Sequence, residues 1–215
     1  MKNLLIIGAR GYGRTTFDIA RLMSSYGREF VVKGFLDDRK DALDNYQDYP
    51  PIITSVEDYR ICPNDVFICA LGDVGYKKKY ASIILEHGGE FMNIIHPNAK
   101  IGMNVKMGVG CIIGNNSYID CDTEIGNFVS IQVNAVIGHD TKLGDWSMID
   151  CFAFTGGFSV IEESVTLHTS SIVIPGKHIG NNAIINAGSV VIRDVKPYAT
   201  VMGNPAKELI IPKIK

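Results

Sequence analysis

The spacing of apolar and polar residues divides the chain at about residue 95. Before that point, apolar runs of strand length alternate with segments whose apolar residues follow a helical spacing. Strands are expected over residues 3–8 (NLLIIG), 30–38 (FVVKGFLDD) and 65–73 (DVFICALGD), and an amphipathic helix over 77–89 (KKKYASIILEHGG). Because strands alternate with helices, residues 1–95 are predicted to form a Rossmann-like parallel α/β domain.

From Ile101 onward the apolar residues recur with a period of six. Every sixth position from Ile101 to Val191 is apolar in fifteen cases of sixteen, without an insertion, and the exception is Thr155. The next residue is glycine in eight of the sixteen repeats, and the residue four places after the apolar one is small or β-branched except at Lys177. This pattern is the hexapeptide repeat of a left-handed parallel β-helix, which we predict for residues 96–215.

The repeat sets the geometry of the predicted solenoid. Three six-residue sides make one triangular coil, so residues eighteen apart in the sequence stack in adjacent coils. The apolar residue points inward, and glycine is expected to relieve the tight corner that follows it. The repeats make about five coils, or roughly 25 Å at a strand spacing of ~4.8 Å. Because a solenoid with flat exposed sides usually buries one of them against copies of itself, we expect a homotrimer.

Composition and charge exclude several classes of partner. The formal net charge is −2, which gives no electrostatic reason to expect nucleic acid or an anionic membrane. No apolar run approaches the ~20 residues that span a bilayer, and only four apolar residues precede Gly8, so neither a membrane segment nor a signal peptide is expected. Five cysteines without a C-x-x-C pair fit free thiols in a cytoplasmic protein.

The stretch VIGHDT places a histidine, His139, beside an aspartate, Asp140, within the repeat. The eighteen-residue register puts Cys121 one coil before His139 and Gly157 one coil after it. A histidine stacked on a glycine has open space and backbone N–H groups beside it, which suits a thioester carbonyl and its oxyanion. Asp140 would hold the imidazole in one tautomer. The alternative is that Asp140 is a solvated turn residue.

A metal site is not expected. His139, His168 and His178 are separated by 29, 10 and 39 residues, none of which is a multiple of eighteen. No two of these histidines therefore stack on one face of a single chain, as the ligands of a zinc ion would have to do.

Several segments together carry a family resemblance. These are IIGARGYG (6–13), FLDD (35–38), IHPNAKIG (95–102), IGHD (137–140) and VMGNPAKEL (201–209). In this order they resemble the hexapeptide-repeat sugar acetyltransferases that use acetyl-CoA. The branch includes sialic acid O-acetyltransferases and N-acetyltransferases that act on nucleotide-linked 4-amino-4,6-dideoxy sugars.

The resemblance implies a mechanism of direct transfer in a site between subunits. His139 would be the general base, Asp140 its orienting carboxylate, and Gly157 a backbone donor to the acetyl carbonyl. Gln132 would lie at the acceptor site, where similar enzymes carry Asn, and Met148 stands where many members have a second histidine. The residues implied to contact acetyl-CoA are Met148, Gly157, Ala187, Gly203, Asn204, Pro205, Ala206 and Lys207.

The glycine turn near the N-terminus has two interpretations. Its pattern is G-x-x-G-x-G, which differs from the dinucleotide fingerprint and also suits a tight strand-to-helix turn. The functional interpretation uses the helix N-terminus as a phosphate cradle and the acids at the end of the second strand as hydrogen-bond acceptors. Lys77 and Lys78 would add positive charge, or would form a solvated helix face. The residues implied to bind the nucleotide sugar are Gly8, Arg10, Gly11, Tyr12, Gly13, Asp37, Asp38 and Gly72.

The sequence therefore predicts an acetyl-CoA-dependent enzyme that acetylates the amine of a nucleotide-linked 4-amino-4,6-dideoxy sugar. A UDP- or dTDP-linked substrate is expected rather than a GDP-linked one. Two alternatives stay open: O-acetylation of sialic acid or another surface-polysaccharide sugar, and a non-catalytic module that binds a nucleotide and trimerises.

Overall fold

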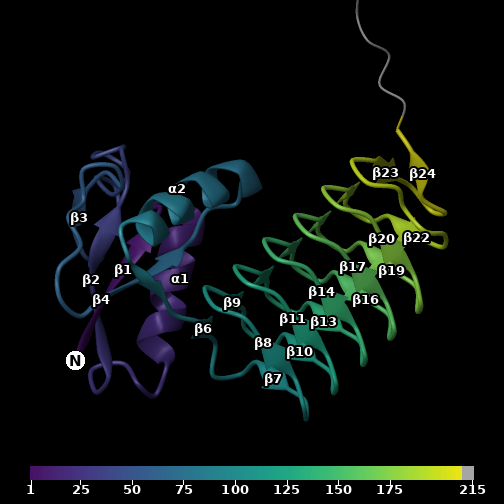
Figure 1. Ribbon diagram of the computed structural model, residues 1–215, viewed down its shortest axis with the longest axis horizontal. Coiled ribbons are helices and arrows are strands. Elements are labelled where there is room, and N and C mark those ends of the chain that lie inside the picture. The colour runs from purple at the N-terminus through teal and green to yellow at the C-terminus, as the bar shows by residue number, and fades with distance from the viewer. Residues whose placement is uncertain (210–215) are drawn as a thin grey trace, which may run out of the picture. The chain divides into compact units, whose positions relative to one another are not determined.

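A computed structural model of the chain describes residues 1–209 (Figure 1). Its contacts divide into two compact units. The first comprises residues 1–97 together with 109–113, and the second comprises residues 98–108 and the chain from Gly114 onward. An α/β unit followed by a β-solenoid confirms the predicted fold class.

The first unit is built on a five-stranded parallel sheet with the strand order β3-β2-β1-β4-β5. Its centre is formed by β1 and β4, whose apolar side chains are almost wholly buried. Neither of its helices, of 12 and 13 residues, is long enough to cross a membrane. The elements are β1 (Lys2–Ile7), α1 (Gly11–Leu22), β2 (Phe30–Leu36), β3 (Ile52–Thr54), β4 (Asp65–Cys69), α2 (Val74–Glu86), β5 (Glu90–Phe91), β6 (Ile94–Ile95) and β9 (Ile112–Ile113).

The expected strands of the first unit correspond to β1, β2 and β4, but the short strands β3 and β5 were not predicted. No helix connects β2 to β3, where residues 37–51 form turns instead. In a parallel sheet of this order, the crevice lies at the carboxyl ends of the strands where the strand order reverses, between β1 and β4. The first unit therefore presents its binding edge at residues that follow β1, β2 and β4.

The second unit is a solenoid of short strands that stack in three sheets, parallel except for the antiparallel pair of β23 and β24 (Figure 1). The first solenoid sheet contains β7 (Lys100–Ile101), β10 (Tyr118–Ile119), β13 (Val136–Ile137), β16 (Phe154–Thr155), β19 (Ile172–Val173) and β22 (Val190–Val191). The second contains β8 (Lys106–Met107), β11 (Glu124–Ile125), β14 (Lys142–Leu143), β17 (Val160–Ile161) and β20 (His178–Ile179). The third contains β12 (Ser130–Ile131), β15 (Met148–Ile149), β18 (Thr166–Leu167), β21 (Ile184–Ile185), β23 (Thr200–Met202) and β24 (Lys207–Glu208).

The eighteen-residue register is confirmed as far as β22, and the last coil is two residues shorter, since Ile184 pairs with Thr200. Ile119 pairs with Ile137, and Ile137 with Thr155, so each inward residue stacks on the one a coil away. From Ile113 to Val191 every one of these inward side chains is at most 5% exposed. Ile101, in the first coil, is 42% exposed. The predicted core column is thus the real hydrophobic core of the solenoid.

The predicted role of the corner glycines was wrong. Glycines that follow the inward residue, such as Gly138, do not have positive φ; a Cβ on Gly138 would lie 2.6 Å from the backbone nitrogen of Gly157 in the next coil. They are needed because adjacent coils approach closely. The left-handed conformation falls two residues later, at non-glycine residues such as Asp140 (φ 54°) and Phe158 (φ 59°).

Candidate functional site

A crevice of about 530 Å³ opens at the carboxyl ends of β1, β2 and β4 in the first unit. It brings together six of the residues predicted to bind a nucleotide sugar. These are Gly8, Arg10, Tyr12, Asp37, Asp38 and Gly72. Of the other two predicted glycines, Gly13 packs closely against the turn, because a Cβ there would lie 1.9 Å from the carbonyl oxygen of Gly8, and Gly11 begins α1.

The two acidic residues after β2 have different surroundings. One carboxylate oxygen of Asp37 accepts a hydrogen bond from the Ala9 N–H (2.8 Å), and the other accepts one from the Arg39 N–H (2.9 Å). Asp37 therefore fixes the turn between β1 and α1. Asp38 is exposed at the crevice and makes none of the side-chain hydrogen bonds found within residues 1–209. Its carboxylate is the one that can accept hydrogen bonds from a bound molecule.

Two tyrosines on α2 line the same crevice and were not predicted. Tyr76 and Tyr80 stack with a centroid separation of 6.4 Å and an interplanar angle of 17°. Burial, followed by the nearby carboxylates of Glu57 and Asp38, raises the pKa of Tyr80. The signal in the sequence was their spacing of four residues, which places both rings on one side of a helix.

Lys77 neither supplies charge to the crevice nor lies on a solvated helix face, so both interpretations of this residue were wrong. Its side chain is fully buried, and burial lowers its pKa to about 8 although the Cys69 and Cys111 thiols oppose the shift. Burial likewise raises the pKa of Cys69 to about 12. Periodicity alone could not show that this face of α2 turns inward.

The His139 corner joins the first solenoid sheet to the second, between β13 and β14. His139 Nδ1 lies 2.8 Å from the Asp140 Oδ2 atom. The Asp140 N–H donates to the carbonyl oxygen of Cys121 in the preceding coil (3.1 Å). The left-handed backbone of Asp140 and this bond fix the carboxylate beside the ring. The other ring nitrogen, Nε2, remains on the side that faces Gly157.

The structure confirms the predicted stacking of His139 over Gly157. A Cβ at Gly157 would lie 2.7 Å from both Cε1 and Nε2 of the imidazole, so only glycine leaves room for the ring. The Gly157 N–H donates to no group within the part of the chain that the structure describes. Phe158 packs edge-on against the ring at a centroid distance of 5.0 Å. An imidazole, an N–H group without an acceptor among the described residues, and an aromatic side chain therefore lie together at this corner.

The His139 corner is open in a single chain. The side chains of His139 and Asp140 are 47% and 43% exposed, and Phe158 is 62% exposed. Cys121 lies in the same corner, where a hydrogen bond to the Asp122 carboxylate and burial raise the pKa of its thiol. A raised pKa makes Cys121 a poor nucleophile.

The other predicted residues of the solenoid do not gather around His139 within one chain. Gln132 and Ala187 lie in the corner between the third and first solenoid sheets. Residues 203–206 form the largely exposed connection from β23 to β24, and Lys207 begins β24. Met148, in β15, is 4% exposed and offers no surface to a bound molecule.

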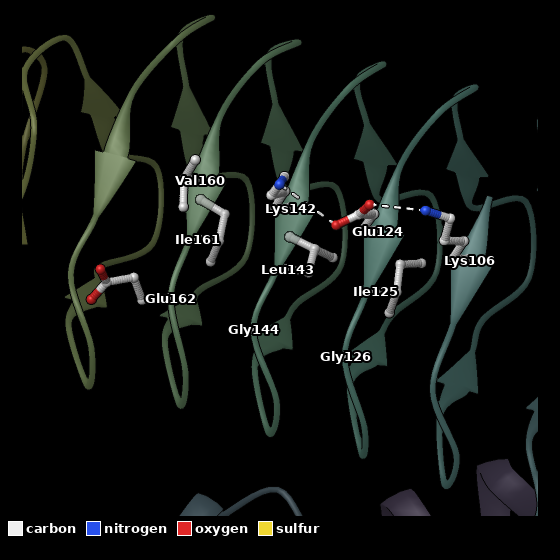
Figure 2. A pocket seen from close by; sticks show the side chains of 10 residues that line it. All are labelled: Lys106, Glu124, Ile125, Gly126, Lys142, Leu143, Gly144, Val160, Ile161 and Glu162. Carbon is white, nitrogen blue, oxygen red and sulfur yellow. Dashed lines mark hydrogen bonds and ion pairs between the residues drawn. The ribbon is translucent and has the colours of Figure 1, made fainter. Parts of the chain in front are cut away.

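A cavity of about 480 Å³ lies along the outer face of the second solenoid sheet (Figure 2). Figure 2 shows Glu124 between Lys106 (3.2 Å) and Lys142 (3.6 Å), so that one carboxylate compensates two ammonium groups. Such exposed pairs contribute little to stability. Among the residues that the structure describes, no group of three or more His, Cys, Asp or Glu side chains could hold a metal ion.

The sequence and the fold of the chain are similar to those of known acetyltransferases. Residues 3–84 match the PglD N-terminal domain. Along 95% of its length the chain is 28% identical to a GDP-perosamine N-acetyltransferase of Escherichia coli, of which it also covers 95%. The fold matches that of a variant perosamine N-acetyltransferase from Caulobacter crescentus, solved with CoA and GDP-perosamine, at 25% identity, with a TM-score of 0.87 over 98% of both chains.

Along its whole length the chain is similar to hexapeptide-repeat sugar acetyltransferases. A further solved structure of the same fold is the acetyltransferase domain of PglB from Neisseria gonorrhoeae with acetyl coenzyme A. It is 23% identical, with a TM-score of 0.87, and the match covers 97% of this chain and 99% of that one. The family resemblance inferred from the sequence is confirmed.

Proposed function

We propose that this acetyltransferase moves the acetyl group of acetyl-CoA to the amine of a nucleotide-linked 4-amino-4,6-dideoxy sugar. The observation that carries the proposal is the His139 imidazole, held by Asp140 and lying against Gly157. The whole-length match to enzymes that act on GDP-perosamine supports the substrate class. No cysteine acyl-enzyme is required, because the raised pKa of Cys121 disfavours its thiolate.

In this mechanism the chain positions the reactants and moves one proton. With Nδ1–H donated to Asp140, His139 Nε2 accepts a proton from the sugar amine as its nitrogen bonds to the acetyl carbon. The Gly157 N–H donates to the acetyl oxygen while negative charge develops there. The carbon–sulfur bond then breaks, and the proton on His139 passes to the departing thiolate.

The crevice of the first unit would hold the nucleotide. The turn fixed by Asp37 presents the N-terminus of α1, which suits a diphosphate, and Arg10 adds positive charge. Asp38 would accept hydrogen bonds from the base or ribose. The expected preference for UDP or dTDP finds no support, since two of the relatives that match along the whole chain are perosamine N-acetyltransferases, one named for GDP-perosamine and one solved with it. A GDP-linked sugar is therefore the first substrate to test.

The active unit would be a homotrimer that packs through the first solenoid sheet. Its outward side chains after Lys100 are all apolar or aromatic: Tyr118, Val136, Phe154, Ile172 and Val190. The second sheet instead carries the charged series Lys106, Glu124 and Lys142 outward. The proposed assembly gives the open His139 corner a second wall, with Ala187 and residues 203–207 along the CoA path.

A thiol-release assay tests the proposal. Acetyl-CoA is offered with GDP-, UDP- and dTDP-linked 4-amino sugars and with free sialic acid. We expect turnover with a nucleotide-linked amino sugar and a loss of at least about 100-fold in kcat for His139→Ala, as for removal of a general base. Turnover of free sialic acid alone, or a fully active His139→Ala variant, would overturn the proposal.

A further inference from the structure

A second histidine–carboxylate pair lies on the solenoid, away from the His139 corner. His168 Nδ1 is 2.9 Å from Asp150 Oδ2, and the two residues are eighteen positions apart, one directly above the other. Their side chains are 42% and 25% exposed. The same eighteen-residue column contains Gln132, so a ladder of polar side chains follows the corner between the third and first solenoid sheets. We call this ladder of Gln132, Asp150 and His168 the polar column.

The His139 corner and the polar column lie at opposite edges of the first solenoid sheet. That sheet is the apolar one, with Tyr118, Phe154 and Ile172 each 38–42% exposed. When three copies pack through this face around an axis parallel to the solenoid, each copy places one edge of the sheet beside the opposite edge of its neighbour. The His139 corner of one copy then faces the polar column of the next.

The heights of the two edges along the solenoid also agree. Gln132 precedes His139 by seven residues of an eighteen-residue coil and Asp150 follows it by eleven, which correspond to about 2 Å and about 3 Å along the axis at ~4.8 Å per coil. His168 follows His139 by 29 residues, which corresponds to about 8 Å along the axis on the same scale. The polar column of one copy therefore spans the level of His139 in the next, and His168 lies on the side of Gly157.

We propose that the His168–Asp150 pair of one copy completes the acetyl-transfer site of its neighbour. With Nδ1–H donated to Asp150, the imidazole presents Nε2, which makes no hydrogen bond among the described residues, as an acceptor. His168 accepts a hydrogen bond from an N–H or O–H of the bound substrates and orients them toward His139, without taking the reacting proton. This inference rests on the proposed function and on the proposed trimer.

A kinetic comparison tests the role of His168. His168→Ala is expected to raise the KM for the sugar or for acetyl-CoA about tenfold, as for a lost hydrogen bond, while kcat changes by less than about threefold. His178→Ala is the matched control, because His178 Nε2 forms a similar pair with Glu162 Oε1 (2.7 Å) on the second solenoid sheet. Equal kinetic constants for His168→Ala and the wild type would overturn the inference.

Cross-linking tests the geometry without any activity. Cys121 lies at the His139 corner and Cys151 follows Asp150, and both are partly exposed. In a Cys62→Ser background, a short bismaleimide should join Cys121 of one copy to Cys151 of another, giving dimer and trimer bands that disappear in Cys121→Ser. A trimer that yields only products within one chain would show that the two corners do not meet. Cross-linked trimers of a protein that releases no thiol would instead refute the proposed function and leave the geometry standing.

Discussion

The contact between His139 and Gly157 depends on the absence of a single carbon atom. A Cβ on Gly157 would lie only 2.7 Å from the His139 ring, so the ring would have to move away from it. The inward core residues of these coils would stay in place. The eighteen-residue spacing predicted this stacking from the sequence. The bond between His139 and Asp140 could also be anticipated, because the two residues are adjacent. The left-handed φ of Asp140 that makes the bond possible could not be.

Gly157→Ala should therefore impair catalysis without unfolding the protein. We expect kcat to fall at least about tenfold, equivalent to about 1.4 kcal/mol in the barrier, because the proposed base is displaced. Gly156→Ala is the matched variant: its Cβ would lie 2.4 Å from the Pro175 backbone nitrogen and does not approach the ring. Gly156→Ala should lower the melting temperature more than Gly157→Ala does. A lower melting temperature for Gly157→Ala than for Gly156→Ala would contradict this prediction.

The lowered pKa of the buried Lys77 side chain leads us to expect an unusual dependence of the free energy of unfolding on pH. Its folded-state pKa is about 8, below the ordinary value of 10.5, because the side chain is buried. Between these two values the unfolded chain binds a proton that the folded chain does not, so the stability conferred by this residue rises with pH, by at most about 3 kcal/mol.

Urea unfolding of the wild type and Lys77→Met at pH 7 and pH 9.5 measures this contribution. The wild type should gain more stability over this interval than Lys77→Met, in which the titrating group is absent. Other groups titrate equally in both proteins and cancel in the comparison. A wild type that gains no more stability than the variant would show that Lys77 keeps its ordinary pKa when folded.

At the scale of the elements, the inward column of the solenoid contains one polar residue. Thr155, in β16, is fully buried, and its hydroxyl has no hydrogen-bond partner. Thr155→Val keeps the shape and removes an unsatisfied group, so it should stabilise the protein by about 1 kcal/mol. Thr141→Val is the control, since the Thr141 hydroxyl donates to the Gly156 carbonyl oxygen (3.3 Å) and its loss should destabilise. Chemical denaturation gives the free energy of unfolding of each variant. If both variants are less stable than the wild type, the expectation for Thr155→Val is contradicted.

Sequence period predicted the solenoid better than it predicted the first unit. Fifteen apolar positions in one six-residue register leave a single arrangement that buries all of them, and the strand pairs confirm it. In the first unit, β3 and β5 have three and two residues, too few to show a period. The inward face of α2 was missed for a related reason, because one of its buried residues is a lysine.

At the scale of the whole molecule, the apolar outer face of the first solenoid sheet predicts how the assembly can be broken. Phe154 lies in the middle of this face and is 38% exposed. Phe154→Glu would place a charge in the proposed interface, where it has no partner, and should yield monomers by light scattering after size exclusion. Acetyl transfer should fall with the loss of the trimer, because the His139 corner loses its second wall.

Val160→Glu is the control for this experiment. Val160 is exposed to almost the same extent, 37%, but lies on the charged face of the second solenoid sheet. This variant should remain trimeric. Monomers from Val160→Glu together with trimers from Phe154→Glu would move the interface to the other face. The sequence indicated that some flat side is buried, but not which, because all three sides share one period.

The regular stacking of the coils, eighteen residues apart up to β22 and sixteen from β21 to β23, also fixes distances along the solenoid axis. Along the solenoid axis, residues 203–207 lie about 17 Å from the His139 corner at a strand spacing of ~4.8 Å per coil. Inserting one complete coil between them would leave every inward contact intact and lengthen this climb by a single strand spacing. The length of the acyl carrier that can reach from one point to the other would then be set by the number of coils and by no individual side chain.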